Sequence, residues 1–331
     1  MRHPLSLLLL ALSLLPLGAP LPVAASGEAD AAGENTAGTD APAAAPTRPA
    51  QPERSAAAAA ALAEFLPAQE QQQLQTDEES FLALWLPANT AQAHGVVVLV
   101  GGDGETPDWP TSLGPLRRKL PDIGWHSLAL GLPDPLDSLA QARPLASTDT
   151  PGETPATDEP ATPAEGAEVA AATAEMAATE QEAPTDPAAR HARRIDQRIG
   201  AALALARQQQ AKRIALLGHG SGAYWAARYL DENSPGDVQY LLMVAVEQPT
   251  DLVPSLDEVL ARLDLATGDF YYGDRPAARD AAKRRAQASR RRGEAAYSQV
   301  ALKAVPGNPA QTQEQSFRRL RGWLERQLKA H

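Results

Sequence analysis

The sequence of 331 residues contains no cysteine, and this absence excludes disulfide bonds as a source of stability. The folded part must therefore be held together by an ordinary hydrophobic core. The absence also removes the cysteine to which a bacterial lipoprotein attaches its lipid. Histidine is scarce, and its six copies are scattered singly, so no pattern has the spacing of metal ligands. We therefore expect no metal site and no bound cofactor.

Long hydrophobic runs are also missing, except for an apolar stretch over residues 5–17 that follows the basic residue Arg2. This stretch is shorter than the about 20 residues that span a bilayer. Small residues follow at 23–25, as they do at signal cleavage sites. The pattern predicts a secretory signal peptide over residues 1–25 and hence a periplasmic or secreted protein. An N-terminal membrane anchor is the alternative.

Basic residues are outnumbered, and the formal net charge of −11 argues against nucleic acid as a partner. Residues 144–189 hold ten acidic side chains, no basic one and no aromatic ring. Such a segment cannot bury enough apolar surface to offset its chain entropy, so we predict a disordered acidic insert there. A second flexible segment is predicted over residues 26–64, which are rich in Ala, Gly, Pro and Thr.

The remaining chain alternates strand patterns with helical ones. The apolar runs at 95–102 and 238–246 are typical of strands that are buried on both faces. Further strand patterns occur at 80–88, 125–133, 213–218, 269–273 and 297–305, and helical spacing occurs at 113–120, 195–206, 223–230 and from 312 onward. This alternation predicts an α/β fold with a doubly wound, mostly parallel sheet over residues 65–331, interrupted by the insert.

Several of these segments resemble the motifs of the α/β-hydrolase superfamily. The segment "RIALLGHGSGAYWAARYL" (213–230) resembles the strand, turn and helix of a nucleophile elbow. "GVVVLVGGDG" followed by "GWHSLALGLPD" resembles the early strand, HGxG-type loop and next strand, and "FYYGD" resembles the strand that delivers the catalytic acid. The resemblance implies a site made from the oxyanion-type loop and the elbow, namely Gly101, Gly102, Gly104, Gly218, His219, Gly220 and Gly222.

A narrower resemblance is to an uncharacterised family of exported proteobacterial proteins, a domain of unknown function with a degenerate elbow. The residues that carry it are the signal peptide, the "DWP…PLRRKLPDIGW" block and the glycine at the elbow. That family is classed as α/β-hydrolase-like without an established activity, so the resemblance implies a fold and no substrate.

The catalytic positions themselves depart from the hydrolase pattern. In the G-x-S-x-G frame, Gly220 stands where the serine belongs and Ser221 lies one residue later. Choosing Ser221 as the nucleophile would place the bulky His219 where a small residue is usual. The resemblance implies Asp274 as the acid, but the loop expected to carry the histidine contains Asn308, whose amide cannot accept the serine proton. The pattern therefore predicts a pseudoenzyme.

Two functions remain open at this point. The first is an exported α/β-hydrolase-like protein that lacks standard serine-hydrolase chemistry and acts by binding in the cell envelope. The alternative is a serine esterase or related hydrolase with an atypical site that uses Ser221, with Asp274 as its acid.

A strongly basic segment at 275–292 carries eight Lys and Arg side chains opposed only by Asp280. At helical spacing it predicts an exposed basic helix that could bind an anionic surface, such as lipid headgroups. A solvated helix without a partner and an internal contact with the acidic insert are the alternatives. The side chains expected to bind are Arg279, Lys283, Arg284, Arg290, Arg291 and Arg292.

Overall fold

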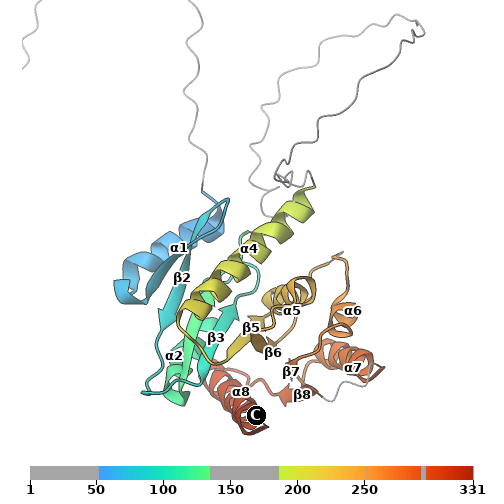
Figure 1. Ribbon diagram of the computed structural model, residues 1–331. Helices are drawn as coiled ribbons and strands as arrows, with labels where there is room; N and C mark the ends of the chain where they lie inside the picture. Colours follow the sequence, from blue (N-terminus) through green and yellow to red (C-terminus); the bar gives the residue numbers. More distant parts are fainter. Residues whose placement is uncertain (1–51, 135–185, 251, 292–295, 331) are drawn as a thin grey trace, which may run out of the picture. The chain divides into compact units, whose positions relative to one another are not determined.

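The computed structural model describes residues 52–134, 186–250, 252–291 and 296–330 (Figure 1). Within them lies an eight-stranded sheet with the order β1-β2-β4-β3-β5-β6-β7-β8. The strands are β1 Gln71–Gln75, β2 Ser80–Leu86, β3 Gly95–Val100, β4 Trp125–Leu130, β5 Ile214–His219, β6 Val238–Val244, β7 Ala266–Tyr272 and β8 Tyr297–Leu302. Strands β3 to β8 pair in parallel, whereas β1 and β2 pair antiparallel at one edge. The doubly wound, mostly parallel sheet predicted from the sequence is confirmed.

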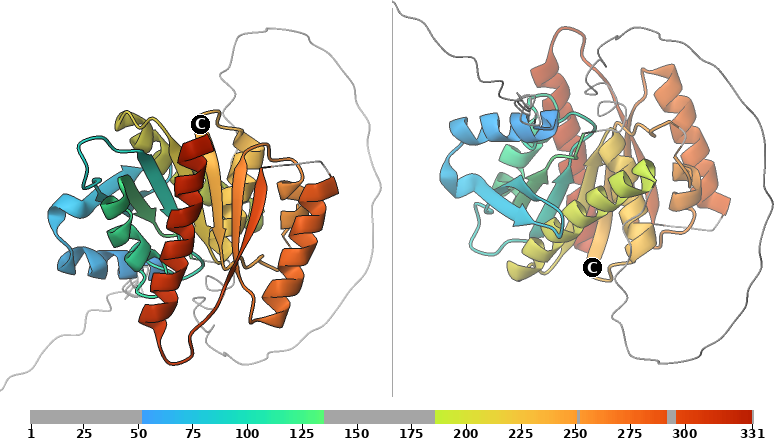
Figure 2. Two further views of the ribbon diagram at one scale, coloured as in Figure 1. Left: turned by 90° about the horizontal axis from the view of Figure 1, so that it is seen from below. Right: turned by 90° about the horizontal axis from the view of Figure 1, so that it is seen from above.

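Helices cover both faces of this sheet. They are α1 Arg54–Phe65, α2 Leu113–Lys119, α4 Pro187–Gln208, α5 Ser221–Asn233, α6 Leu256–Leu260, α7 Pro276–Arg291 and α8 Pro309–Ala330, with short 3-10 turns η1 Ala68–Glu70 and η2 Pro121–Ile123. Figure 2 shows α8 across one face and α4 across the opposite face. No helix in the described part of the chain is both long and apolar enough to cross a membrane.

The central strand β3 explains how one sheet supports two cores. All six of its residues are buried, and their side chains alternate between the faces. Val96, Val98 and Val100 pack with α4, α5 and α6, whereas Val97 and Leu99 pack with α2 and α8. An apolar run without polar alternation is therefore what this position in the sheet requires.

The ends of both predicted flexible segments are corrected by the structure. Residues 54–64, which we predicted as flexible, form helix α1, because alanine has the highest helix propensity and Asp134 accepts the first free N–H groups. Residues 186–189, predicted as the end of the insert, begin α4, with Asp186 as its N-cap. The predicted signal peptide and most of both segments predicted to be flexible lie outside the described residues.

The basic segment forms α7 as predicted, but only one of its sides is exposed. Arg285 is 5% exposed and forms an ion pair with the fully buried Asp269 at 2.9 Å. Arg279, Lys283, Arg284 and Arg290 are exposed, while the side chains of residues 291 and 292 lie outside the described part. Arg285 is therefore an internal anchor of α7, and binding of an anionic surface stays a prediction.

Candidate functional site

The turn between β5 and α5 falls on Gly220. This residue has φ 58° and ψ −126°, a positive-φ conformation that glycine adopts without the steric cost of a Cβ atom. Its N–H donates to the carbonyl of Val244, and its own carbonyl accepts from the N–H of Glu247, both at 3.0 Å. α/β-Hydrolases place their nucleophile on a sharp strand-to-helix turn of this kind. In this chain the residue on the turn has no side chain.

The glycines on either side of the turn are required by packing. A Cβ atom on Gly218 would lie 2.3 Å from the Cα atom of Ala223, and one on Gly222 would lie 2.2 Å from the carbonyl oxygen of Gly101. A Cβ atom on Gly220 itself would meet nothing closer than the Cα atom of Gly102 at 3.7 Å. The close approach of α5 to β3 and β5 therefore requires the glycine spacing that resembles a nucleophile elbow in the sequence.

Ser221 occupies the first position of α5 and is 5% exposed. Its Oγ accepts a hydrogen bond of 2.8 Å from the backbone N–H of Asp103, in the loop that follows β3. Burial raises the pKa of the Asp103 carboxyl, although a hydrogen bond with Ser221 and the nearby His191 act in the opposite direction. Ser221 thus connects the start of α5 to the oxyanion-type loop.

No histidine in the described part of the chain forms a hydrogen bond with Ser221. The Nδ1 atom of His219 lies 3.0 Å from Oε2 of Glu105. The other described histidines make different contacts: His126 accepts from the N–H of Ala88, His94 lies against Trp125, and His191 lies edge-on to Trp225. His3 and His331 are outside the described residues. A general base for Ser221 is therefore not found among the four described histidines.

Glu105 is a functional candidate that sequence reasoning missed. Its carboxylate accepts from the N–H of Gly102 and from the hydroxyl of Ser112, both at 2.8 Å, and it pairs with His219. Burial opposes ionisation, but these partners together lower the pKa of Glu105. The only signal in the sequence was an acidic residue three positions after a glycine in a tight turn.

Several N–H groups of the oxyanion-type loop already have hydrogen-bond partners within the protein. In α/β-hydrolases an N–H from this loop points at the developing oxyanion. Here the N–H of Gly102 binds Glu105, and the N–H of Asp103 binds Ser221. Gly101 donates its N–H to Leu130 of β4 at 3.1 Å, and Gly104 has a positive φ of 74°.

The two remaining positions implied by the hydrolase resemblance have other contacts. Asp274 is exposed, and its Oδ2 accepts from the N–H of Ala304 at 3.2 Å. Asn308 precedes α8, and its Oδ1 accepts from the N–H of Gln311 at 2.9 Å, as an N-cap does. In the described part of the chain, no hydrogen bond or ion pair joins either residue to Ser221.

One protein family matches most of the length of this chain. The family described as "Protein of unknown function (DUF3530)" matches residues 5–326. The chain belongs to this family. No curated protein is significantly similar to the chain.

The solved structures that are similar to this chain include an esterase. A structure of the esterase Pf2001 from Pyrococcus furiosus matches with 10% identity and a TM-score of 0.50, covering 77% of this chain and 89% of that chain. Est1E from Butyrivibrio proteoclasticus matches with 8% identity and a TM-score of 0.49, covering 77% of this chain and 99% of that chain. At such identities the Pf2001 match shows the α/β-hydrolase fold alone, as the sequence predicted.

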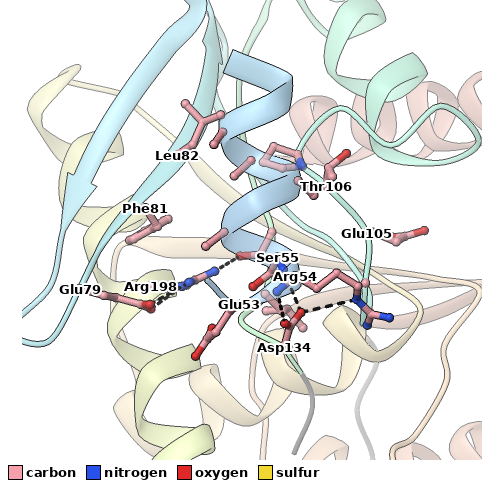
Figure 3. Close-up of a pocket in the computed structure, with 18 of the residues that line it drawn as sticks. Glu53, Arg54, Ser55, Glu79, Phe81, Leu82, Glu105, Thr106, Asp134 and Arg198 are labelled. Carbon is pink, nitrogen blue, oxygen red and sulfur yellow. Dashed lines mark hydrogen bonds and ion pairs between the residues drawn. The ribbon is translucent and has the colours of Figure 1, made fainter. Parts of the chain in front are cut away.

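Beside the oxyanion-type loop, this member of the family has a cavity of about 880 Å³ (Figure 3). Helix α1 borders it opposite strand β2, and the loop over residues 103–109 closes one side. That loop follows β3, from which the chain runs first to β4 on one side and later to β5 on the other. Ligands of doubly wound α/β proteins bind at such a switch point, outside the carboxyl ends of the strands.

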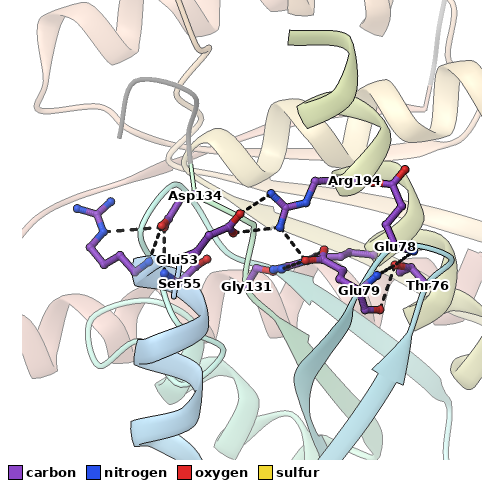
Figure 4. A network of polar contacts seen from close by, with 10 residues as sticks. Glu53, Ser55, Thr76, Glu78, Glu79, Gly131, Asp134 and Arg194 are labelled. Carbon is purple, nitrogen blue, oxygen red and sulfur yellow. Dashed lines mark hydrogen bonds and ion pairs between the residues drawn. The ribbon is translucent and has the colours of Figure 1, made fainter. Parts of the chain in front are cut away.

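A network of ion pairs fixes the start of α1 against α4 and β2 (Figure 4). Arg194 of α4 binds both carboxylate oxygens of Glu53, at 2.9 and 3.0 Å, and also reaches Glu79 at 2.7 Å. Arg198 binds Glu79 at 2.6 and 2.9 Å and donates to the carbonyl of Gly131 at 3.0 Å. Although burial opposes ionisation, the two arginines lower the pKa of Glu79. These four charged groups therefore bind one another and stabilise this wall of the cavity.

Proposed function

We propose that this protein is a non-catalytic member of the α/β-hydrolase fold that acts by binding a ligand in the cell envelope. The observation that carries the proposal is Gly220. It has the positive-φ conformation of the strand-to-helix turn, and it lacks any side chain that could attack a substrate. Without a nucleophile at this turn, the covalent route of serine hydrolases has no starting point.

The occupied N–H groups of the oxyanion-type loop support the same proposal. A tetrahedral intermediate is stabilised by donors that are aimed at the developing negative charge. Here Glu105 accepts from Gly102, so a carboxylate occupies the donor and adds negative charge close by. An oxyanion in this place would be repelled, which favours a binding role over an acyl-transfer role.

Ser221 is the basis of the alternative esterase function. Its hydroxyl is engaged with the N–H of Asp103, and a serine without a general base is a weak nucleophile. Asp274, the acid of that alternative, is exposed and bound to the backbone of Ala304. We therefore favour binding over catalysis by Ser221.

Labelling with a fluorophosphonate tests the absence of chemistry. We expect no covalent adduct on the purified protein and no turnover of short p-nitrophenyl esters above background. The matched control is Ser221→Ala, which should give the same result as the unchanged protein in both assays. Labelling or turnover that disappears in Ser221→Ala would establish the esterase alternative.

Gly220→Ser tests whether the elbow alone restores activity. No atom lies closer than 3.7 Å to a Cβ atom added at Gly220, so there is room for the side chain, but the new hydroxyl would have no base. Because catalytic residues act as a unit, restoring one member recovers little. We expect Gly220→Ser to stay near background. Gly220→Ser combined with Asn308→His, with Asp274 kept as the acid, is the smallest change that could rebuild a triad.

The location in the cell envelope rests on the signal-peptide pattern of residues 1–25. Cell fractionation and N-terminal sequencing of the mature protein test it. We expect an envelope or secreted fraction that begins after Ala25. A mature protein that begins at Met1 would contradict export by this route.

A further inference from the structure

The cavity beside α1 has apolar walls and a carboxylate for which the described residues offer no ion pair, and we propose that it binds an amphipathic organic cation. This inference rests on the proposed binding function and specifies its ligand. The ligand would carry an ammonium group next to Asp103 and an apolar body between α1 and β2.

The volume and the walls of the cavity suit a small molecule. Its volume of about 880 Å³ lies within the usual range of roughly 300–1,000 Å³ for ligand sites. The α1 side is lined by alanines, including Ala56, Ala59 and Ala63, and the opposite side by Phe81 and Leu82 of β2. Alanine side chains are too short to fill this space, and α1 has no fully buried residue. The wall is therefore apolar but does not occupy the cavity.

Polar contacts at both ends keep α1 in place over this space. At its start, Asp134 accepts from the N–H groups of Arg54 and Ser55 at 2.7 and 3.0 Å. At its end, the side-chain amide of Gln71 donates to the carbonyls of Ala63 and Leu66 at 2.8 and 2.9 Å. These hydrogen bonds hold α1 at both ends, while none of its residues is fully buried, which leaves the space beneath it available to a ligand.

The charges around the cavity favour a cation. Five carboxylates and three guanidinium groups line it. Glu53 and Glu79 are paired with Arg194 and Arg198, and Glu105 with His219. Asp134 binds the start of α1 and lies 3.9 Å from Arg54. Among the described residues that line the cavity, Asp103 is the carboxylate for which no ion pair is found.

Asp103 is an exposed residue of the cavity wall, and its carboxyl has a hydrogen bond with Ser221 but no ion pair among the described residues. Desolvation raises the pKa of this carboxyl, and His191, a base that acts on it electrostatically, has its own pKa lowered by burial. Neutral His191 supplies no full positive charge near pH 7. An ammonium group of a ligand beside Asp103 would supply a full positive charge.

Two further groups on the wall can receive such a ligand. The hydroxyl of Ser55 is buried and has no hydrogen-bond partner in the described structure, so it can bind a polar head. The ring of Trp109 is 37% exposed, unusually open for a large aromatic residue, and it lines the same cavity. An aromatic face attracts an organic cation, most strongly a quaternary ammonium.

Isothermal titration calorimetry with three probes of equal chain length tests the proposal: octyltrimethylammonium, octanoate and 1-octanol, each kept below its aggregation limit. We expect octyltrimethylammonium to bind about tenfold more tightly than the other two, as one favourable charge contact implies. Its affinity should fall as salt is added. Equal affinity for the three probes, tighter binding of octanoate, or no binding of the cation would overturn the proposal.

Variants assign the binding to this cavity. Asp103→Asn keeps the size of the side chain and its backbone N–H, and it should weaken octyltrimethylammonium by about tenfold while leaving 1-octanol unchanged. The matched control is Glu64→Gln, which removes an exposed carboxylate of α1 outside the cavity wall and should leave all affinities unchanged. An unchanged affinity in Asp103→Asn would overturn the assignment.

Ala59→Leu fills the apolar space and should weaken the binding of both octyltrimethylammonium and 1-octanol, with folding checked by circular dichroism.

The outcome is separable from that of the binding function itself. If no probe binds and fluorophosphonate still fails to label the protein, only the ligand class is wrong. If Ser221 is labelled, the proposed function is wrong whatever the cavity binds.

Discussion

The elbow between β5 and α5 is tightly packed in this molecule, whereas the loops that follow β7 and β8 are exposed. At the elbow, Gly218 and Gly222 are confined by backbone atoms that would lie 2.3 and 2.2 Å from an added Cβ atom. After β7 and β8, Asp274 and Asn308 are exposed, and their side chains accept from the backbone N–H groups of Ala304 and Gln311. Both regions carry catalytic residues in an active hydrolase.

The difference separates what a fold needs from what a reaction needs. The small residues of the elbow let α5 approach the sheet, so the core constrains them even when the turn residue is Gly220. A catalytic acid or histidine at the end of a strand contributes little to the core. Such positions can change without destabilising the protein, and an elbow motif can therefore persist without its chemistry.

The largest expected effect is at the elbow. Gly222→Ala would force a Cβ atom to within 2.2 Å of the carbonyl oxygen of Gly101, and the backbone would have to move. We expect a loss of about 3 kcal/mol or more in the free energy of unfolding, measured by urea denaturation. Gly236→Ala, where nothing lies within 4 Å of the added atom, is the control and should change stability by less than about 0.5 kcal/mol. Equal losses of stability in Gly222→Ala and Gly236→Ala would contradict the packing role of Gly222.

The second effect is at Glu105, in the loop next to the elbow. Glu105→Gln should cost about 2 kcal/mol at pH 7, because a buried carboxylate with three hydrogen bonds is replaced by an amide. The folded-state pKa of Glu105 lies below its ordinary value of 4.5, so its contribution is present above that pH and is lost as the pH falls further.

Urea denaturation near pH 7 and near pH 4 measures this dependence, and the stability difference between the unchanged protein and Glu105→Gln should shrink at the lower pH. Glu78→Gln, at an exposed carboxylate, is the matched control and should show no such trend. A difference that does not depend on pH would show that Glu105 is not ionised in the folded protein.

A smaller effect is expected at Asn308, in the loop where a hydrolase keeps its histidine. Its side chain accepts from the N–H of Gln311 at the start of α8. Removing such a cap in Asn308→Ala should lower the free energy of unfolding by about 1 kcal/mol in urea denaturation. Asn308→Asp, which retains a capping oxygen, should keep most of the stability. A loss in Asn308→Asp as large as in Asn308→Ala would contradict the capping role.

The smallest effect is expected at Asp274. Asp274→Asn removes a charge from an exposed side chain whose oxygen binds one backbone N–H. Stability in urea should change by less than about 0.5 kcal/mol. Asp269→Asn, five residues earlier on β7, is the contrast, because it breaks the buried pair with Arg285 and should cost about 3 kcal/mol or more. Ester turnover that depends on Asp274 would favour the esterase alternative.

Much of the fold could be predicted because periodicity reports burial directly. Every strand from β2 to β8 and the helices α2, α4, α5, α7 and α8 were expected near their observed bounds. β1 was missed because its sequence, QQQLQ, carries almost no apolar signal, and it pairs only along one edge. α1 was missed because its alanine-rich composition also fits a flexible segment, and the contact that fixes its start comes from Asp134, about eighty residues away.

The candidate site was predictable only in part. The spacing of Gly218, Gly220 and Gly222 indicated the elbow, because close backbone approach restricts residue type locally. Glu105 and the cavity were not visible in the sequence. A carboxylate that binds Gly102, Ser112 and His219 is recognised only when the three are brought together.

The sequence by itself determined the layered α/β architecture and the absence of a serine at the elbow, since apolar period and residue identity are local properties. The tertiary structure decided which N–H groups of the oxyanion-type loop are free, which carboxylate of the cavity lacks a counterion, and where α1 lies. These depend on distances between residues that are far apart in the chain. Hydrogen bonds and charge pairs act over a few ångströms, so their partners are set by folding and not by order along the sequence.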